Sequence, residues 1–156
     1  LYDFDKQGRV KSQEIVSDKK AKRPDKKAFY AASGDVNRQC TDRDGDGDFD
    51  IDLRFEAGQA TQAVTDTTGS GRTDRREVYE NGALVRVEAD TNADGRPDVV
   101  QVYEGSTVVR QDEDSDFDGT IDVRFEEGKP VELEGREKAP GKIPELDCGR
   151  FSSFWG

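Results

Sequence analysis

Histidine and methionine are missing from this 156-residue chain, and hydrophobic residues make up only 31% of it. The lack of histidine removes the commonest general base and the commonest transition-metal ligand, which excludes serine-protease-like triads and imidazole zinc sites. So few apolar residues leave no segment for a membrane span and place the chain near the limit below which a hydrophobic core alone does not hold a fold. We therefore expect a protein that is not an enzyme and that needs stabilisation beyond its core.

Positive charge is scarce after the first third of the chain. The whole chain has 24 Lys and Arg against 35 Asp and Glu, a net charge of −11, and the basic residues are concentrated in positions 1–38. The acidic remainder would repel the phosphates of nucleic acid, so we expect no nucleic-acid partner. Because the chain begins at Leu1 and has no methionine, we expect a processed product or a piece of a longer protein, which a signal peptide or lipid anchor could precede.

A 24-residue period dominates residues 42–134. Between recurring aspartates and glycines, aromatic-acid-glycine segments such as residues 79–82 precede short runs of β-prone residues. Each repeat therefore reads as loop, strand, turn, strand, and predicts an all-β fold in which repeated antiparallel hairpins form a meander or an elongated sheet joined by the loops. The recurring residues are Asp42, Asp66, Asp90 and Asp114; Gly47, Gly71, Gly95 and Gly119; and Asp50, Asp74, Asp98 and Asp122.

Residues 77–88 illustrate the predicted hairpin. Asn81 and Gly82 suit a tight turn whose two central residues have positive φ. Strict alternation after this turn would put Leu84 and Arg86 on the same face of the sheet.

Two regions are expected along the chain. Residues 1–134 form the hairpin array, with degenerate repeats in 1–41 and well-formed repeats in 42–134, and residues 135–156 form an extended C-terminal tail. The segment from Asp3 to Glu14 also fits a 12-residue EF-hand loop, although Lys11 at the ninth position is a poor calcium ligand. We favour a hairpin for this segment.

Aspartates at alternate positions of the recurring loops indicate calcium. The loop 42–50 has carboxylates at positions 1, 3, 5 and 9 and glycine at position 6, and the loops 90–98 and 114–122 repeat the pattern in phase. Calcium takes six to eight oxygens, which alternate residues of a tight loop direct inward while position 7 adds its backbone carbonyl. Solvated acidic turns are the alternative interpretation. The predicted ligands are Asp42, Asp44, Asp46, Asp48 and Asp50; Asp90, Asn92, Asp94, Arg96 and Asp98; and Asp114, Asp116, Asp118, Thr120 and Asp122.

The loop 66–74 is a weaker candidate, because hydroxyls replace two of its carboxylates. The other three loops have no acid at position 12, so water or a nearby acid such as Asp52 would complete the coordination, and no helix-loop-helix switch is implied. The candidate ligands of the weaker loop are Asp66, Thr68, Ser70, Asp74 and, at position 12, Glu77.

The basic segment 18–27 stands where a further loop is expected. Three interpretations are open: a degenerate loop in which lysine ammonium groups replace the metal, a solvated basic turn, or a patch for anionic lipid or polysaccharide. The lysines concerned are Lys19, Lys20 and Lys22.

Residues 2–9 (YDFDKQGR), 79–86 (YENGALVR) and 90–98 (DTNADGRPD) together resemble the tandem-repeat envelope lipoproteins of myxobacteria and related deltaproteobacteria. The aspartate loops alone are similar to those of thrombospondin type 3 repeats and dockerins, an EF-hand-like pattern that implies ligands at positions 1, 3, 5 and 9. The spacers depart from dockerins, which have helices there. The resemblance implies an exported, calcium-binding and lipid-anchored protein, and it implies no activity.

The two cysteines, Cys40 and Cys148, are consistent with one disulfide in an oxidising compartment or with two reduced thiols. In an open sheet, strands spaced by about 4.8 Å would separate them by about 40 Å, whereas a disulfide needs Cα atoms within about 7 Å. Either the sheet closes or the tail runs back across it, and we favour the tail because residues 135–148 can extend over about 46 Å. The tail aromatics would then cover a sheet face or form a docking segment: Phe151, Phe154 and Trp155.

These features together predict a calcium-stabilised structural or interaction module, without catalysis, in the extracellular space or the cell envelope, meaning the periplasm or outer membrane. The expected partner is an envelope protein or a polysaccharide, with an upstream lipid anchor bringing the module near a membrane. One alternative is a polysaccharide- or lipid-surface-binding module that uses the basic segment and exposed aromatics. Another is a carboxylate-dependent hydrolase.

Overall fold

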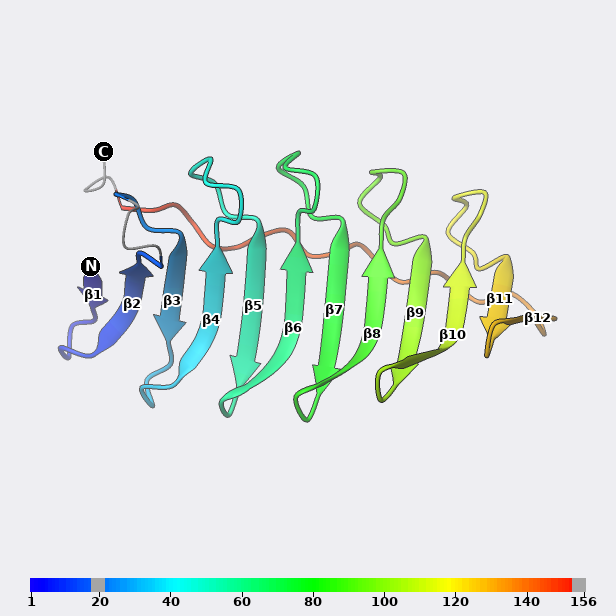
Figure 1. Ribbon diagram of the computed structural model, residues 1–156, viewed down its shortest axis with the longest axis horizontal. Coiled ribbons are helices and arrows are strands. Elements are labelled where there is room, and N and C mark those ends of the chain that lie inside the picture. Colours follow the sequence, from blue (N-terminus) through cyan, green and yellow to red (C-terminus); the bar gives the residue numbers. More distant parts are fainter. Residues whose placement is uncertain (18–21, 153–156) are drawn as a thin grey trace.

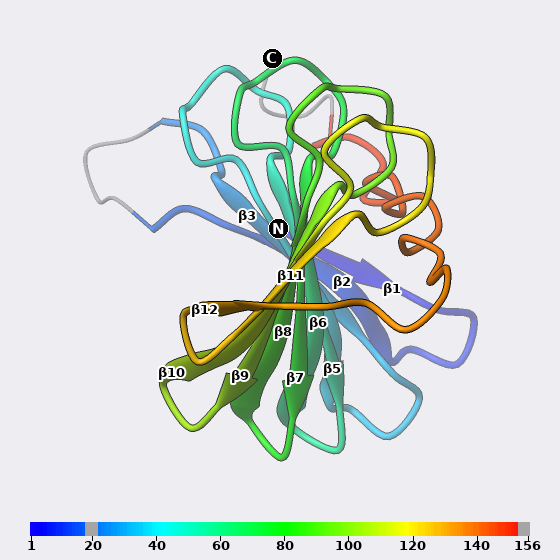
Figure 2. The same cartoon turned by 90° about the vertical axis from the view of Figure 1, so that its right-hand side faces the viewer.

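The computed structural model describes residues 1–17 and 22–152, which form one open antiparallel sheet. Twelve strands lie in chain order and each pairs with its neighbours in sequence, so the predicted all-β hairpin meander is confirmed (Figure 1). The sheet twists strongly about its long axis and leaves β1 and β12 at its two edges (Figure 2). The strands are β1 (Tyr2–Phe4), β2 (Val10–Ile15), β3 (Lys26–Tyr30), β4 (Val36–Thr41), β5 (Ile51–Glu56), β6 (Gln59–Thr65), β7 (Arg75–Glu80), β8 (Ala83–Ala89), β9 (Val99–Glu104), β10 (Thr107–Glu113), β11 (Val123–Glu126) and β12 (Lys129–Val131).

The hairpin turns contain a feature that alternation did not predict. Asn81 and Gly82 have φ angles of 51° and 77°, as the tight turn requires. The register then shifts between Val78 and Tyr79, so that Leu84 lies opposite Tyr79. Leu84 therefore lies on the opposite face of the sheet from Arg86. The prediction that they share a face is wrong, because one extra residue interrupts the alternation between them. The same shift recurs in the hairpins β1–β2, β3–β4, β5–β6 and β9–β10.

The N-terminal segment is a hairpin and not an EF-hand loop. Strands β1 and β2 pair antiparallel around a turn at Gly8, whose φ is 79°. Asp5 stabilises this turn, because its carboxylate accepts hydrogen bonds of 2.9 Å from the backbone N–H groups of Gln7 and Arg9. The hydrogen bond from the Arg9 backbone outweighs desolvation and lowers the pKa of Asp5. The carboxylate that an EF-hand would offer to calcium is thus used within the turn.

Residues 132–152 run back along the whole sheet, and we call them the strap (Figure 1). A disulfide joins Cys148 of the strap to Cys40 of β4, with Cα atoms 6.1 Å apart. The sheet therefore stays open, and the tail runs back to bring the two cysteines together, as we expected from the sequence. Polar contacts attach the strap to successive strands and loops: Ala139 N to Gly119 O at 2.9 Å, Ile143 N to Gly95 O at 3.0 Å, Thr73 Oγ1 to Pro144 O at 2.8 Å and Lys27 Nζ to Arg150 O at 3.2 Å.

A thin core lies where the strap meets the bases of the aspartate loops. The strap contributes buried Ile143 and Cys148, and the ring of Phe151 lies 4.3 Å from that of Phe49. The predicted contribution of Phe151 is thus observed, whereas Phe154 and Trp155 lie outside the described residues. The loops contribute the residue at position 8, which is buried in every case: Phe49, Thr73, Pro97 and Ile121.

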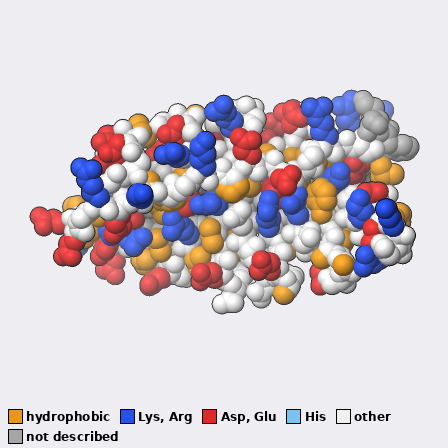
Figure 3. Space-filling view, turned by 180° about the vertical axis from the view of Figure 1, so that it is seen from behind, with side chains coloured by type: hydrophobic (Ala, Val, Ile, Leu, Met, Phe, Trp, Pro, Cys, Tyr) orange, Lys and Arg blue, Asp and Glu red, His pale blue; other side chains and the backbone are white. Residues whose placement is uncertain are grey.

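Three buried acids on the strap side of the sheet are each held between two arginines. Directly paired residues of antiparallel strands share a face, and the pairing places these acids in one continuous row with Cys40. Seen from behind, Lys and Arg side chains are spread along this face (Figure 3). The clamps are Asp52 with Arg38 and Arg54, Glu88 with Arg76 and Arg86, and Asp112 with Arg110 and Arg124.

Removing one arginine of a clamp should leave a buried charge poorly compensated. Arg76→Met is expected to lower the free energy of unfolding by about 2–3 kcal/mol, because Glu88 would keep only the more exposed Arg86. Chemical denaturation measures this loss. The exposed Arg136 provides a control, since R136M should change stability by less than about 0.5 kcal/mol. Equal effects of the two substitutions on the free energy of unfolding would show that the clamps do not stabilise the fold.

Candidate metal centre

Four loops stand along one edge of the sheet, each joining an even-numbered strand to the next odd-numbered strand (Figure 1). We number them loop 1 (42–50), loop 2 (66–74), loop 3 (90–98) and loop 4 (114–122). The ladder of backbone hydrogen bonds continues into their bases and fixes how neighbouring loops are spaced. The N–H at position 1 of one loop donates to the carbonyl at position 9 of the loop before: Asp66 to Asp50, Asp90 to Asp74 and Asp114 to Asp98, each at 2.8 Å.

All four loops share one framework of side-chain hydrogen bonds. The aspartate at position 1 accepts from the backbone N–H of the glycine at position 6, where positive φ makes the bend. The aspartate at position 9 accepts from the N–H at position 2 and closes the loop. The first bond is Asp42 with Gly47 at 2.9 Å, Asp66 with Gly71 at 2.7 Å, Asp90 with Gly95 at 2.7 Å and Asp114 with Gly119 at 2.8 Å. The second is Asp50 with Arg43 at 2.7 Å, Asp74 with Thr67 at 3.0 Å, Asp98 with Thr91 at 2.8 Å and Asp122 with Ser115 at 2.8 Å.

Loops 1 and 4 bring together the carboxylates at positions 1, 3 and 9. In each loop, one oxygen from each of these three residues lies within 4.8 Å of the other two. The position-1 residues are buried and the position-3 residues are exposed, so each group opens toward solvent on one side. Such a group can hold a metal ion. The groups are Asp42, Asp44 and Asp50 in loop 1 and Asp114, Asp116 and Asp122 in loop 4.

The charges in these two loops repel one another. In loop 1 the backbone N–H of Asp48 favours the ionised form of Asp46, but desolvation and the charges of Asp44 and Asp42 outweigh it and raise the pKa of Asp46. In loop 4, desolvation and neighbouring carboxylates raise the pKa of Asp116. A bound cation would remove this repulsion, so the electrostatics fit a metal.

Loop 3 leaves one carboxylate oxygen without a partner. Oδ1 of Asp90 is buried and accepts no hydrogen bond from any described residue. The position-3 residue is Asn92, whose amide oxygen is also a calcium ligand type. Asp98 is held by the backbone N–H and the hydroxyl of Thr91, the latter at 2.6 Å. Because an unpaired buried carboxylate oxygen is costly, its presence fits a cation at this position.

Loop 2 satisfies its own oxygens. Oδ1 of Asp66 accepts from the backbone N–H and hydroxyl of Thr68 and from the N–H groups of Gly69 and Ser70, at 2.9 to 3.2 Å. Burial disfavours the charge of Asp66, yet these bonds and that from Gly71 outweigh it and lower the pKa. Backbone N–H groups supply most of these bonds, and the Thr68 hydroxyl adds one at 3.2 Å.

Two acids expected near the loops lie elsewhere. Glu77 sits on β7, where Arg75 Nε at 2.9 Å and the Tyr79 hydroxyl donate to it, so it does not complete loop 2. Asp52 is fully buried on β5 between two arginines and does not complete loop 1. Asp52 also lies near Cys40 and Cys148, but the disulfide occupies both sulfurs and leaves no thiolate ligand there.

The basic segment retains part of the loop framework. Asp25 accepts from the N–H of Ser17 at 2.8 Å, as the position-9 aspartates accept from position 2. Lys22 is exposed, and Lys26 and Lys27 belong to β3. Asp18, Lys19 and Lys20 lie outside the described residues, so the hypothesis that lysine ammonium groups replace the metal concerns residues that the structure does not describe.

Sequence reasoning missed two sets of loop residues. The position-8 residues were not expected in the core, because their types differ from loop to loop and give no repeated signal. The hydroxyls of Thr67, Thr91 and Ser115 at position 2 donate to the position-9 aspartates and were likewise missed. No protein-family model matches the chain, and neither does any curated protein. The acidic groups of loops 1 and 4 therefore point to a metal ion on their geometry alone.

Proposed function

We propose that this chain is a calcium-stabilised, non-catalytic structural module, in which loops 1, 3 and 4 bind calcium. The observation that carries the proposal is the convergence of carboxylate oxygens from positions 1, 3 and 9 in loops 1 and 4. Loop 2, in which Thr68 and Ser70 stand where the other loops have carboxylates or an amide, is proposed to fold without metal.

The donor set favours calcium over other ions. All candidate ligands are oxygens, which suits hard cations, and the exposed loops allow the irregular coordination of six to eight ligands that calcium accepts and magnesium does not. Position-5 carboxylates and the position-7 carbonyls of Asp48, Arg96 and Thr120 would complete the shell. At these positions the N–H of residue 7 already donates to residue 5, at 2.8 Å in each of the three loops, which holds residue 7 beside the position-5 carboxylate.

The proposed location is the extracellular space or the cell envelope. The disulfide is typical of proteins outside the reducing cytosol. Within the described residues no helix has the length and apolar character to cross a membrane. The similarity of the repeats to envelope lipoproteins supports an upstream lipid anchor and an envelope protein or polysaccharide as partner.

Calorimetric titration of the metal-free protein with calcium tests the proposal. We expect two to three sites, and we expect Asp44→Ala to weaken binding at loop 1 by about tenfold or more, because a charged ligand is lost. Asp48→Ala is the matched control, since it removes the same charge from the same loop while the proposed ligand is only the backbone carbonyl. No heat of binding at millimolar calcium, or equal effects of D44A and D48A, would contradict the proposal.

A further inference from the structure

The sheet face away from the strap carries a stripe of apolar side chains near the hairpin turns. Five aromatic residues occupy equivalent places on β1, β3, β5, β7 and β9, and each lies opposite an aliphatic residue of the next strand. Only neighbouring strands contact one another, so no other described strand packs on this face. The aromatic stripe consists of Phe4, Tyr30, Phe55, Tyr79 and Tyr103 with Val10, Val36, Ala60, Leu84 and Val108.

The aromatic stripe is flanked by amides and hydroxyls that hold one another in place. At one end the Tyr30 hydroxyl donates to Gln13 at 2.9 Å, and Gln13 donates to the Tyr2 hydroxyl at 3.1 Å. At the other end the Tyr103 hydroxyl donates to Gln101 at 3.2 Å, and Gln101 donates to Gln111 at 2.9 Å. These groups present fixed donors and acceptors beside the rings.

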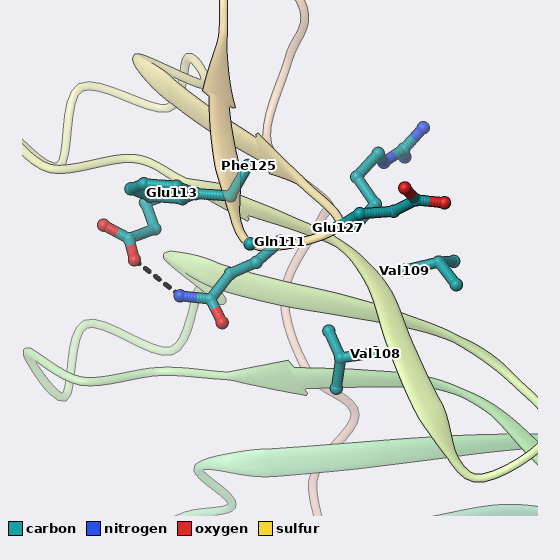
Figure 4. A pocket seen from close by; sticks show the side chains of 8 residues that line it. Val108, Val109, Gln111, Glu113, Phe125 and Glu127 are labelled. Atoms are coloured by element: carbon teal, nitrogen blue, oxygen red, sulfur yellow. Dashed lines mark hydrogen bonds between the residues drawn. The ribbon is translucent and has the colours of Figure 1, made fainter.

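Two hollows interrupt the stripe near its ends. One, of about 440 Å³, is lined by Tyr2, Val10, Gln13 and Tyr30 among others. The second, of about 330 Å³, is lined by Val108, Gln111 and Phe125, with Glu113 accepting from Gln111 at 2.7 Å (Figure 4). Both combine an aromatic ring, an aliphatic side chain and an amide. Charged residues also line them: Arg9 in the first, and Arg110, Glu113 and Glu127 in the second.

The spacing of the rings selects an extended polymer. Successive rings lie two strands apart, about 9.6 Å along the sheet, which is close to the length of two β-linked hexose units in an extended chain. The strong twist of the sheet winds the stripe about the long axis (Figure 2). A rigid protein or a second copy of this twisted sheet could therefore contact only part of the stripe, whereas a flexible linear chain can follow it.

The charges disfavour an anionic polymer. No residue of the aromatic stripe is charged, and the net charge of −11 opposes an anionic polymer. Glu77 is the nearest acid to Tyr79, and its charge is engaged by Arg75. Burial and the hydrogen bond to Glu77 raise the pKa of Tyr79 to about 12, so its hydroxyl stays protonated at physiological pH.

We propose that the aromatic stripe binds a neutral, extended polysaccharide chain of β-linked hexoses. The apolar faces of the sugar rings stack on the exposed sides of the aromatic rings, and sugar hydroxyls exchange hydrogen bonds with Gln13, Gln101 and Gln111. This binding surface lies at the opposite edge of the sheet from the four loops, so it adds an activity to the calcium-stabilised module without using its metal ligands.

Affinity electrophoresis of the calcium-loaded chain in gels containing hydroxyethyl cellulose, a soluble β-1,3-glucan or a β-mannan tests the proposal, with α-linked dextran as the mismatched polymer. We expect retardation by at least one β-linked polymer and none by dextran. The double variant Y79T/Y103T should bind about tenfold or more weakly, because aromatic anchors dominate such interfaces. Threonine keeps the preference for strands. The control is F117N, which removes an aromatic residue that is 47% exposed, at a positive-φ position of loop 4.

Folding and oligomeric state are measured on the same samples. If Y79T/Y103T does not fold, Q101A/Q111A removes hydrogen-bonding groups while keeping all the aromatic rings, and it should still weaken binding. The proposal is overturned if no β-linked polymer is bound, or if F117N loses as much affinity as the stripe variants. It is also overturned if sedimentation shows a wild-type dimer that Y79T/Y103T converts to monomers, because a second copy would then cover the stripe. If a β-linked polymer still retards the protein after calcium is removed by a chelator, polymer binding does not depend on the proposed calcium sites.

Discussion

Removing the disulfide with C40A/C148A is expected to lower the free energy of unfolding by about 4–5 kcal/mol, because the bond closes a separation of 108 residues and so restricts the unfolded chain. The loss is large for a single-layer sheet, since the buried hydrophobic residues beyond the loop bases and the strap are small, such as Val64, Val87 and Val100. The same bond holds the strap over Cys40 and Phe49, which are buried beneath it. Denaturant unfolding under non-reducing conditions measures the loss.

Two comparisons separate the cross-link from the contacts around it. Reduced wild-type protein should unfold with nearly the stability of C40A/C148A, since both lack the covalent bond but keep most of the packing. Thr73→Ala removes only one strap contact, the 2.8 Å hydrogen bond to the Pro144 carbonyl, and should cost about 1 kcal/mol. If C40A/C148A lowered the free energy of unfolding no more than T73A does, non-covalent contacts alone would hold the strap.

The sheet and the loops were predictable because their determinants are local. Asn81 and Gly82 specify a tight turn within two residues, and the aspartate pattern specifies a loop within nine. A 24-residue period then repeats both, and consecutive antiparallel hairpins have only one simple arrangement. The all-β meander followed from these local signals without any long-range information.

The register shifts were not predictable from alternation. The period-2 pattern after Gly82 puts Leu84 with Arg86, but one irregular residue turns Leu84 to the face of Tyr79. That change assembles the aromatic stripe, because it places an aliphatic residue opposite each aromatic ring. A register shift of one residue thus determines which face of the sheet is apolar near the hairpin turns.

Long-range contacts were also not predictable from the sequence. Asp52 and Glu88 look like solvent-exposed strand residues, yet both are almost completely buried, and each is paired with two arginines of neighbouring strands or of its own strand. Asp52 was therefore assigned to loop 1 by proximity in sequence and belongs instead to an ion cluster across strands. The cysteine separation did limit the path of the tail, because residues 135–148 were long enough to return.

The strap and the candidate metal loops use adjacent peptides. The carbonyls of Gly95 and Gly119, at position 6, accept the N–H groups of Ile143 and Ala139 in the strap. The next carbonyl along each loop, at position 7, is a proposed calcium ligand. A cation that fixes one peptide would thereby fix its neighbour, so calcium binding and strap docking should reinforce each other.

Calcium is accordingly expected to raise the stability of the protein strongly. At a free calcium concentration about a hundredfold above the dissociation constant, each site adds about 2.7 kcal/mol, so three sites would add about 8 kcal/mol, which is comparable to the whole stability of an ordinary domain. Thermal unfolding followed by circular dichroism, in chelator and in calcium, measures the shift. Magnesium at equal concentration should give a smaller one.

The effect of pH on this shift has a defined sign. In the folded metal-free protein the pKa of Asp46 and of Asp116 is raised, whereas hydrogen bonds lower the pKa of Asp44 and of Asp122, so these two pairs contribute to its pH dependence with opposite signs. As the pH falls, protons compete with calcium for the same oxygens. The calcium-dependent rise in melting temperature should therefore shrink between pH 7 and about pH 4. A melting temperature that is equal in chelator and in calcium at pH 7 would mean that the aspartates serve only the hydrogen-bond framework of the loops.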